Sequence, residues 1–89
     1  MTEAQRSRLA ATRTQLDAID ERLLSVLADR AKVVDELWAW KRSEGLPLTD
    51  PQREAAHVDQ LVARAKTLGL EEQATRAVLA TIIGKSLGA

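Results

Sequence analysis

Residues 2–43 read TEAQRSRLAATRTQLDAIDERLLSVLADRAKVVDELWAWKRS and contain neither glycine nor proline. Their apolar positions recur at steps of three, four or seven residues, which is the spacing of one helix face and not the alternation of a strand. These positions are Leu9, Leu16, Ile19, Leu23, Leu27, Val34 and Leu37. A single helix over this stretch would be about 60 Å long. The stretch therefore predicts one very long helix.

A turn separates this stretch from the rest of the chain. Residues Glu44–Thr49 read EGLPLT, and a glycine and a proline two positions apart end a helix and redirect the chain. Asp50 followed by Pro51 is typical of a helix start, because the aspartate can cap the helix and proline fits its first position. We expect the second helix to run from this pair to Gly69.

The last segment predicts a third helix. Glu71 and Glu72 suit its first turn, and we expect it to fray at Gly88 and Ala89. Good helix formers dominate the whole chain, and aromatic residues make up only 2% of it, which argues against a sheet. We see no repeat or second domain, so residues 1–89 are predicted to form a single all-α domain of three helices.

Composition excludes several classes of function. The 89 residues include 13 Lys and Arg and 13 Asp and Glu, and this zero net charge argues against binding to nucleic acid or to an anionic membrane. The absence of cysteine excludes disulfides, thiolate metal sites and a cysteine nucleophile. With His57 as the only histidine, we expect no metal site. No membrane span or targeting segment is visible, so the cytoplasm is the expected location.

The length of the first helix predicts association. Two helices of about half its length cannot cover a helix of about 60 Å. Much of its apolar face would stay exposed in a monomer, and exposed apolar surfaces of that size mark an interface. We expect a homodimer in which the long helices pack together.

Three cations interrupt the apolar face of the long helix. Arg13, Arg30 and Lys41 stand at the same helical spacing as the apolar residues. A buried and unpaired charge is costly, so each cation needs an anion or a route to water. Their long side chains could reach solvent or pair with nearby aspartates. Three cations on one face also indicate a bound small anion.

The spacing of these cations favours a site shared by two chains. Arg30 and Lys41 are about 16 Å apart along the helix axis, close enough for their side chains to converge on one small ligand. Arg13 lies about 25 Å from Arg30 and cannot join them within one straight helix. In an antiparallel dimer with its two-fold axis near Leu24, the partner's Arg13 would fall opposite the interval from Arg30 to Lys41. We expect two identical sites, each completed by the other chain.

The ordered set of motifs resembles a known family. After Leu9 to Arg13, the chain carries LDAIDERLL (16–24), LADR (27–30), Lys41 and LPLTDPQRE (46–54). This set resembles the all-helical chorismate mutases, which are intertwined antiparallel dimers of three-helix chains, and the resemblance runs from Leu9 to Ser86. It implies conversion of chorismate to prephenate in aromatic amino acid biosynthesis. That Claisen rearrangement needs neither a cofactor nor a metal, only orientation and charge stabilisation.

The resemblance implies roles for the polar residues that would hold a dicarboxylate. Arg30 and Arg13, the latter from the neighbouring chain, would hold the carboxylates in bidentate geometry. Lys41 would donate to the ether oxygen of the breaking bond. Arg53 would lie at the mouth of the site, and Ser86 would touch a carboxylate from the third helix.

The resemblance also implies roles for four further residues. Asp50, acting through its backbone, and Glu54 would receive the ring hydroxyl, and we count Glu54 among the catalytic residues with the three cations. Leu37 and Ile83 would form the apolar wall.

One departure from the family concerns the end of the sequence. Family members often carry a glutamine one turn past the serine, which here falls beyond Ala89. A short-tailed subset is activated by 3-deoxy-arabino-heptulosonate-7-phosphate synthase, so the resemblance offers this synthase as a partner. Two alternative activities on the same fold stay open, isochorismate pyruvate-lyase and 4-amino-4-deoxychorismate mutase. A non-catalytic helical dimerisation or regulatory domain is the alternative of another class.

Overall fold

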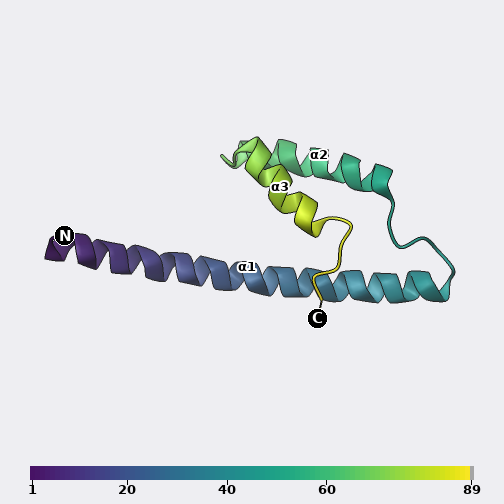
Figure 1. Cartoon of the computed structure of the whole chain (residues 1–89), viewed down its shortest axis with the longest axis horizontal. Helices are drawn as coiled ribbons and strands as arrows, with labels where there is room; N and C mark the ends of the chain where they lie inside the picture. Colours follow the sequence, from purple (N-terminus) through teal and green to yellow (C-terminus); the bar gives the residue numbers. More distant parts are fainter. Residues whose placement is uncertain (89) are drawn as a thin grey trace.

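The computed structural model describes residues 1–88, which form three helices and no strand. They are α1 (Glu3–Ser43), α2 (Pro51–Thr67) and α3 (Glu72–Ile82), in that order. The chain is elongated, with extents of 62 × 28 × 16 Å. α2 and α3 pack against each other beside the C-terminal half of α1, whose N-terminal half extends away from them (Figure 1). The predicted all-α class with one very long helix is confirmed.

Local signals fix both ends of α1. Thr2 caps its N-terminus reciprocally with Gln5: the Thr2 hydroxyl accepts from the Gln5 backbone N–H at 3.1 Å, and the Gln5 side chain accepts from Thr2 N–H at 2.7 Å. At the other end Gly45 adopts a positive φ of 68°. The N–H of Leu46 can then donate to the Lys41 carbonyl at 2.8 Å and close the last turn. The predicted helix over residues 2–43 therefore stands.

The predicted start and end of α2 also stand. The Asp50 carboxylate accepts from the Arg53 backbone N–H at 3.2 Å, and Pro51 occupies the first helical position. The helix stops before Gly69, whose φ is 80°. Leu70 N–H donates back to the Ala65 carbonyl at 3.0 Å.

α3 is shorter than the sequence pattern predicts. It begins as expected, with Glu71 as its cap, but it ends at Ile82 and does not continue to Gly88. Gly84 has a positive φ of 76°, which breaks the helix and redirects the chain. Residues 83–88, here called the tail, leave α3 as irregular chain and cross α1 (Figure 1). Ala89, also expected to fray, lies outside the described residues.

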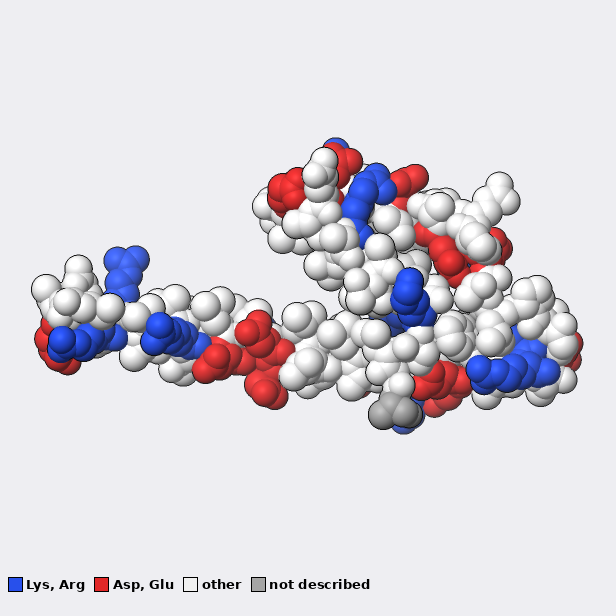
Figure 2. Space-filling model, in the orientation of Figure 1, with Lys and Arg blue, Asp and Glu red and all other residues white. Residues whose placement is uncertain are grey.

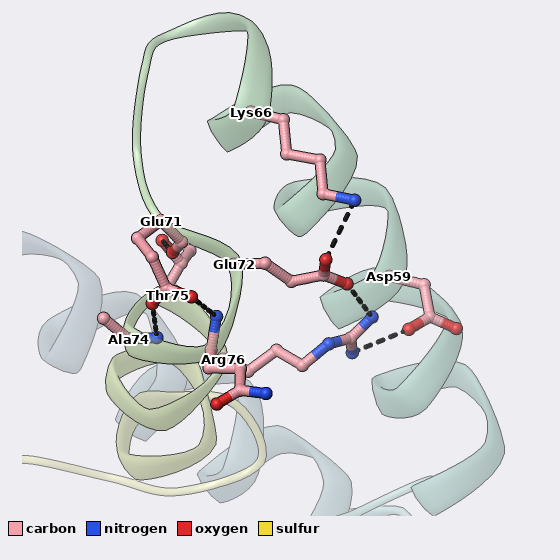
Figure 3. A network of polar contacts seen from close by, with 8 residues as sticks. Asp59, Lys66, Glu71, Glu72, Ala74, Thr75 and Arg76 are labelled. Carbon is pink, nitrogen blue, oxygen red and sulfur yellow. Dashed lines mark hydrogen bonds and ion pairs between the residues drawn. The ribbon is translucent and has the colours of Figure 1, made fainter.

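A network of ion pairs sets α3 against α2 (Figure 3). Arg76 lies 2.9 Å from an oxygen of Asp59 and 3.8 Å from Glu72, and Glu72 lies 2.9 Å from Lys66. These side chains are largely exposed, so each pair contributes at most about 1 kcal/mol. On the same helix as Asp59 and Lys66, the apolar residues Val62 and Ala65 are buried.

A single chain has a small core. Among residues 1–88 the buried apolar side chains are those of Val62 and Ala65 on α2 and of Ala31 on α1. The large apolar side chains of α1 that stay exposed are Leu16, Ile19, Leu23, Leu24, Val26, Val33, Leu37 and Trp40. Such a surface is typical of an interface. In the described part of the chain, none of the helices is both long and apolar enough to span a bilayer.

Candidate functional site

A cavity of about 420 Å³ lies where the C-terminal half of α1 meets the start of α2 and the tail. This volume is in the range of sites for small molecules. Its lining residues are Arg30, Val34, Leu37, Trp38 and Lys41 from α1, Leu48, Asp50, Arg53, Glu54 and His57 from the loop and α2, and Ile83, Gly84 and Lys85 from the tail.

α1 supplies two half-buried cations to this cavity. The Arg30 guanidinium donates to the Ile82 backbone carbonyl at 3.3 Å, and the Lys41 ammonium donates to the Leu48 carbonyl at 3.1 Å. Neither forms an ion pair with any carboxylate of residues 1–88. A neutral carbonyl does not compensate a full charge, so both cations retain the capacity to bind an anion.

The N-terminus of α2 supplies a fixed carboxylate. The Asp50 backbone N–H donates to Oε1 of Glu54 at 3.1 Å. On its other side the carboxylate lies against Gly84, so closely that a Cβ there would stand 2.6 Å from Oε2 of Glu54. Glu54 is half-buried between these two contacts. Its carboxylate is therefore held as an acceptor that faces the cavity.

The charge of the cavity favours a ligand with more than one anionic group. Four of its lining side chains are cationic and two are anionic. Arg53 and Lys85 are the exposed cations, and Lys85 donates to the Ala80 carbonyl at 3.1 Å. Elsewhere both signs of charge are interspersed over the visible face of the molecule, without one continuous patch (Figure 2). The chain as a whole has 13 Lys and Arg and 13 Asp and Glu, so the surplus of cations in the cavity is local.

The structure brings together seven of the nine residues that the sequence singled out. These are Arg30, Leu37, Lys41, Asp50, Arg53, Glu54 and Ile83. Arg13 is exposed and does not line the cavity. Ser86 does not line it either: it lies in the tail and not in α3, and its hydroxyl donates to the Asp35 carboxylate on α1 and not into the cavity.

Sequence reasoning missed the tail as a wall of the cavity. The sequence pattern predicts that the third helix continues through Gly84 and Lys85, whereas the chain turns at Gly84. The available signal was Gly84 itself, since glycine directly after the last apolar pair of a helix is a common stop. Val34 and Trp38 share the helix face of the predicted residues and could have been added from their spacing.

These groups can bind and orient a small molecule that carries several carboxylates and a hydroxyl. The cations offer charge-assisted hydrogen bonds, and Glu54 offers an acceptor. Leu37 and Ile83 give the cavity apolar surface. Within residues 1–88 no group of three or more His, Asp or Glu residues is arranged to hold a metal ion.

Comparisons with known proteins identify a family. The family model described as chorismate mutase type II matches residues 12–88. T-protein of Enterobacter agglomerans is 35% identical over 78 residues, which are 88% of this chain and 21% of T-protein. Chorismate mutase of Methanocaldococcus jannaschii is 29% identical over 65 residues, which are 73% of this chain and 66% of that protein. This chain thus spans less than two thirds of the length of each relative. No solved structure gives a significant match.

The match to the family model covers most of the chain and includes every residue that lines the cavity. It also covers all the motifs on which the resemblance rests except Leu9 to Ala11. The chain belongs to the type II chorismate mutase family.

Proposed function

We propose that this chain is a chorismate mutase, which rearranges chorismate to prephenate in aromatic amino acid biosynthesis and forms one catalytic domain. The observation that carries the proposal is the cavity that Arg30 and Lys41 line without anionic partners and that Glu54 lines as a fixed acceptor. Chorismate has two carboxylates and a ring hydroxyl, so its groups match this arrangement. Family membership supports the same substrate.

The reaction makes modest chemical demands. One ether C–O bond breaks while one C–C bond forms in the same molecule, so no group enters or leaves and no proton must be moved. The protein has to hold the enolpyruvyl side chain over the ring as a near-attack conformer. It also has to stabilise the negative charge that develops on the ether oxygen.

The cations of α1 would orient the substrate and stabilise the developing charge. Arg30 would exchange its hydrogen bond to a backbone carbonyl for a bidentate bond to a substrate carboxylate. Lys41 would likewise leave the Leu48 carbonyl and donate to the ether oxygen, where its charge stabilises the breaking bond. Arg53 at the rim would hold a second carboxylate.

The start of α2 and the apolar wall would orient the ring. Glu54 would accept from the ring hydroxyl, together with backbone groups of Asp50. Leu37 and Ile83 would exclude water from the folded substrate. A contact between Ser86 and a substrate carboxylate would require its hydroxyl to leave Asp35, to which it donates in the structure.

The site would be completed by a second chain. Arg13 is remote from the cavity of its own chain, and the apolar side chains of α1 are exposed. An antiparallel homodimer with its axis near Leu24 would cover those side chains and bring the partner's Arg13 to the substrate. The cytoplasm as location and 3-deoxy-arabino-heptulosonate-7-phosphate synthase as an activating partner stay predictions from sequence.

The direct test is conversion of chorismate by the purified protein, followed by chromatography and NMR, with and without the synthase. We expect one prephenate for each chorismate consumed. Isochorismate and 4-amino-4-deoxychorismate are tested in parallel, and release of pyruvate from isochorismate would identify a lyase instead. A folded protein that converts none of the three would contradict an enzymatic role and favour a dimerisation or regulatory domain.

A further inference from the structure

Three side-chain hydrogen bonds join α1 to the later part of the chain within residues 1–88. Arg30 and Lys41 each donate to a backbone carbonyl, and Ser86 of the tail donates to the Asp35 carboxylate. The first two bonds use cations that the proposed function assigns to the substrate. Once a substrate draws those cations away from their carbonyls, the bond between Ser86 and Asp35 is the one of these three hydrogen bonds that still joins α1 to the later part of the chain.

The contacts around Asp35 form a clasp of three residues, Asp35, Ser86 and Gly88. One carboxylate oxygen of Asp35 accepts from the Ser86 hydroxyl. The Gly88 backbone N–H donates to the same hydroxyl at 3.1 Å. Gly88 also lies so close to the second carboxylate oxygen that an added Cβ would overlap it. A charge-assisted bond and a close-fitting glycine thus fasten the tail to α1.

The clasp adjoins the cavity without lining it. Ser86 directly follows Ile83–Lys85, the three tail residues that form one wall of the cavity. The middle residue of this wall, Gly84, lies against the Glu54 carboxylate. The backbone of the tail is irregular, so the position of the wall depends on this contact and on the clasp that directly follows it.

We propose that Asp35 is a positioning residue for the reaction, because its clasp on Ser86 holds the Ile83–Lys85 wall over the cavity. This inference rests on the proposed function. A serine hydroxyl has a single proton to donate, so while the clasp is closed Ser86 cannot also donate to a substrate carboxylate. Ser86 therefore acts through the placement of the tail and not by direct contact with the substrate.

The first experiment measures the tail without any substrate. Amide hydrogen exchange of residues 83–88 is compared in the wild type, Asp35→Leu, Asp35→Asn and Glu36→Leu. Glu36 is the matched control, since it is the adjacent exposed acid of α1 and makes no side-chain hydrogen bond or ion pair among residues 1–88. We expect about tenfold faster exchange in Asp35→Leu, the effect of losing one charge-assisted hydrogen bond. Unchanged exchange in Asp35→Leu would overturn the proposal.

The second experiment measures chorismate turnover by the same variants. A displaced wall weakens substrate and transition-state binding alike, so we expect KM to rise about tenfold in Asp35→Leu while kcat stays within about threefold. Asp35→Asn keeps an acceptor for the hydroxyl and should recover most of the wild-type KM. A fall in kcat with unchanged KM, or no recovery in Asp35→Asn, would contradict a positioning role.

A double-mutant cycle separates the clasp from a direct contact. If Ser86 acts only through Asp35, Ser86→Ala raises KM in the wild type and changes nothing further in Asp35→Leu. A further rise in the double variant would mean that Ser86 binds the substrate itself, which overturns the proposal. If the wild type converts no chorismate, the proposed function fails, whereas the exchange experiment still decides whether Asp35 holds the tail.

Discussion

At the scale of single residues, the cations of the cavity were recognisable because they break a pattern. Arg30 and Lys41 stand where the helical period calls for apolar side chains, and a charge in such a position requires a local reason. The structure supplies one, since both line a cavity and donate only to neutral carbonyls. Gly84 offers a sequence signal for the end of a helix, but its contact with Glu54 could not be predicted, because that contact depends on the path of the backbone, which no periodicity encodes.

Lys41 offers a direct test of the proposed chemistry. We expect Lys41→Ala to lower kcat/KM for chorismate about a hundredfold or more, because it removes a donor to charge that develops in the transition state. The matched control is Arg42→Ala, which removes the adjacent exposed cation and should stay within about threefold of the wild type. Steady-state kinetics measure both, and circular dichroism checks the fold. Equal losses in the two variants would indicate a general effect of charge.

Gly84 permits a second comparison between matched variants. Gly84 and Gly69 both have a positive φ, of 76° and 80°, so substitution by alanine should cost about 1 to 2 kcal/mol of folding stability at either position. Only at Gly84 would the new Cβ meet the Glu54 carboxylate, whereas at Gly69 nothing lies within 4 Å. We therefore expect similar losses of Tm but a raised KM for chorismate in Gly84→Ala alone. An equal KM in the two variants would show that the contact of Gly84 with Glu54 has no bearing on the site.

At the scale of elements, the helix boundaries that carry local signals were predictable from the sequence. The turn at Gly45, the Asp50–Pro51 start and the stop at Gly69 all follow from capping chemistry, which acts within a few residues. The predicted end of α3 was wrong because Ile82 and Ile83 continue the apolar periodicity of the helix up to Gly84. Beyond that point the path of the tail is set by contacts with α1, which sequence neighbours do not reveal.

The cap of α3 gives the chain a pH-dependent contribution to stability. The backbone N–H groups of Ala74 and Gln73 donate to the Glu71 carboxylate at 2.6 and 2.9 Å and hold its pKa below the usual 4.5. Because the folded pKa is lowered, this contribution is full above about pH 4.5 and is lost as the pH falls through the folded value.

Denaturant unfolding at several pH values tests this cap. Glu71→Ala should be less stable than the wild type at pH 7, and the difference should shrink as the solution is acidified below the folded pKa. Glu21→Ala serves as the control, because the side chain of this exposed acid makes no hydrogen bond or ion pair among residues 1–88. A difference between Glu71→Ala and the wild type that does not change with pH would rule out the carboxylate as its source.

At the scale of the whole molecule, two features of the single chain support the homodimer that we propose. The described chain buries only Ala31, Val62 and Ala65 as apolar core, while α1 leaves a row of large apolar side chains in solvent. Its cavity also lacks Arg13, the one cation of the predicted set that α1 places far from the others. An antiparallel pair of chains would resolve both features at once, because the contact that covers α1 would bring each Arg13 to the opposite cavity.

Mixing two inactive variants tests this arrangement. We expect Arg13→Ala and Arg30→Ala each to lose most activity, because each lacks one carboxylate-binding guanidinium at every site. If Arg13 acts across the dimer, a mixed dimer has one site with both arginines intact and one with neither. Random exchange of subunits, by joint unfolding and refolding, should then restore about a quarter of the wild-type activity, since half of the dimers are mixed and each carries one working site. If Arg13 serves the site of its own chain, every site in the mixture lacks one arginine and no activity returns. The wild type, carried through the same refolding, gives the maximum activity that can be recovered. If two inactive variants regain activity when they are mixed, the active site must be built from both chains.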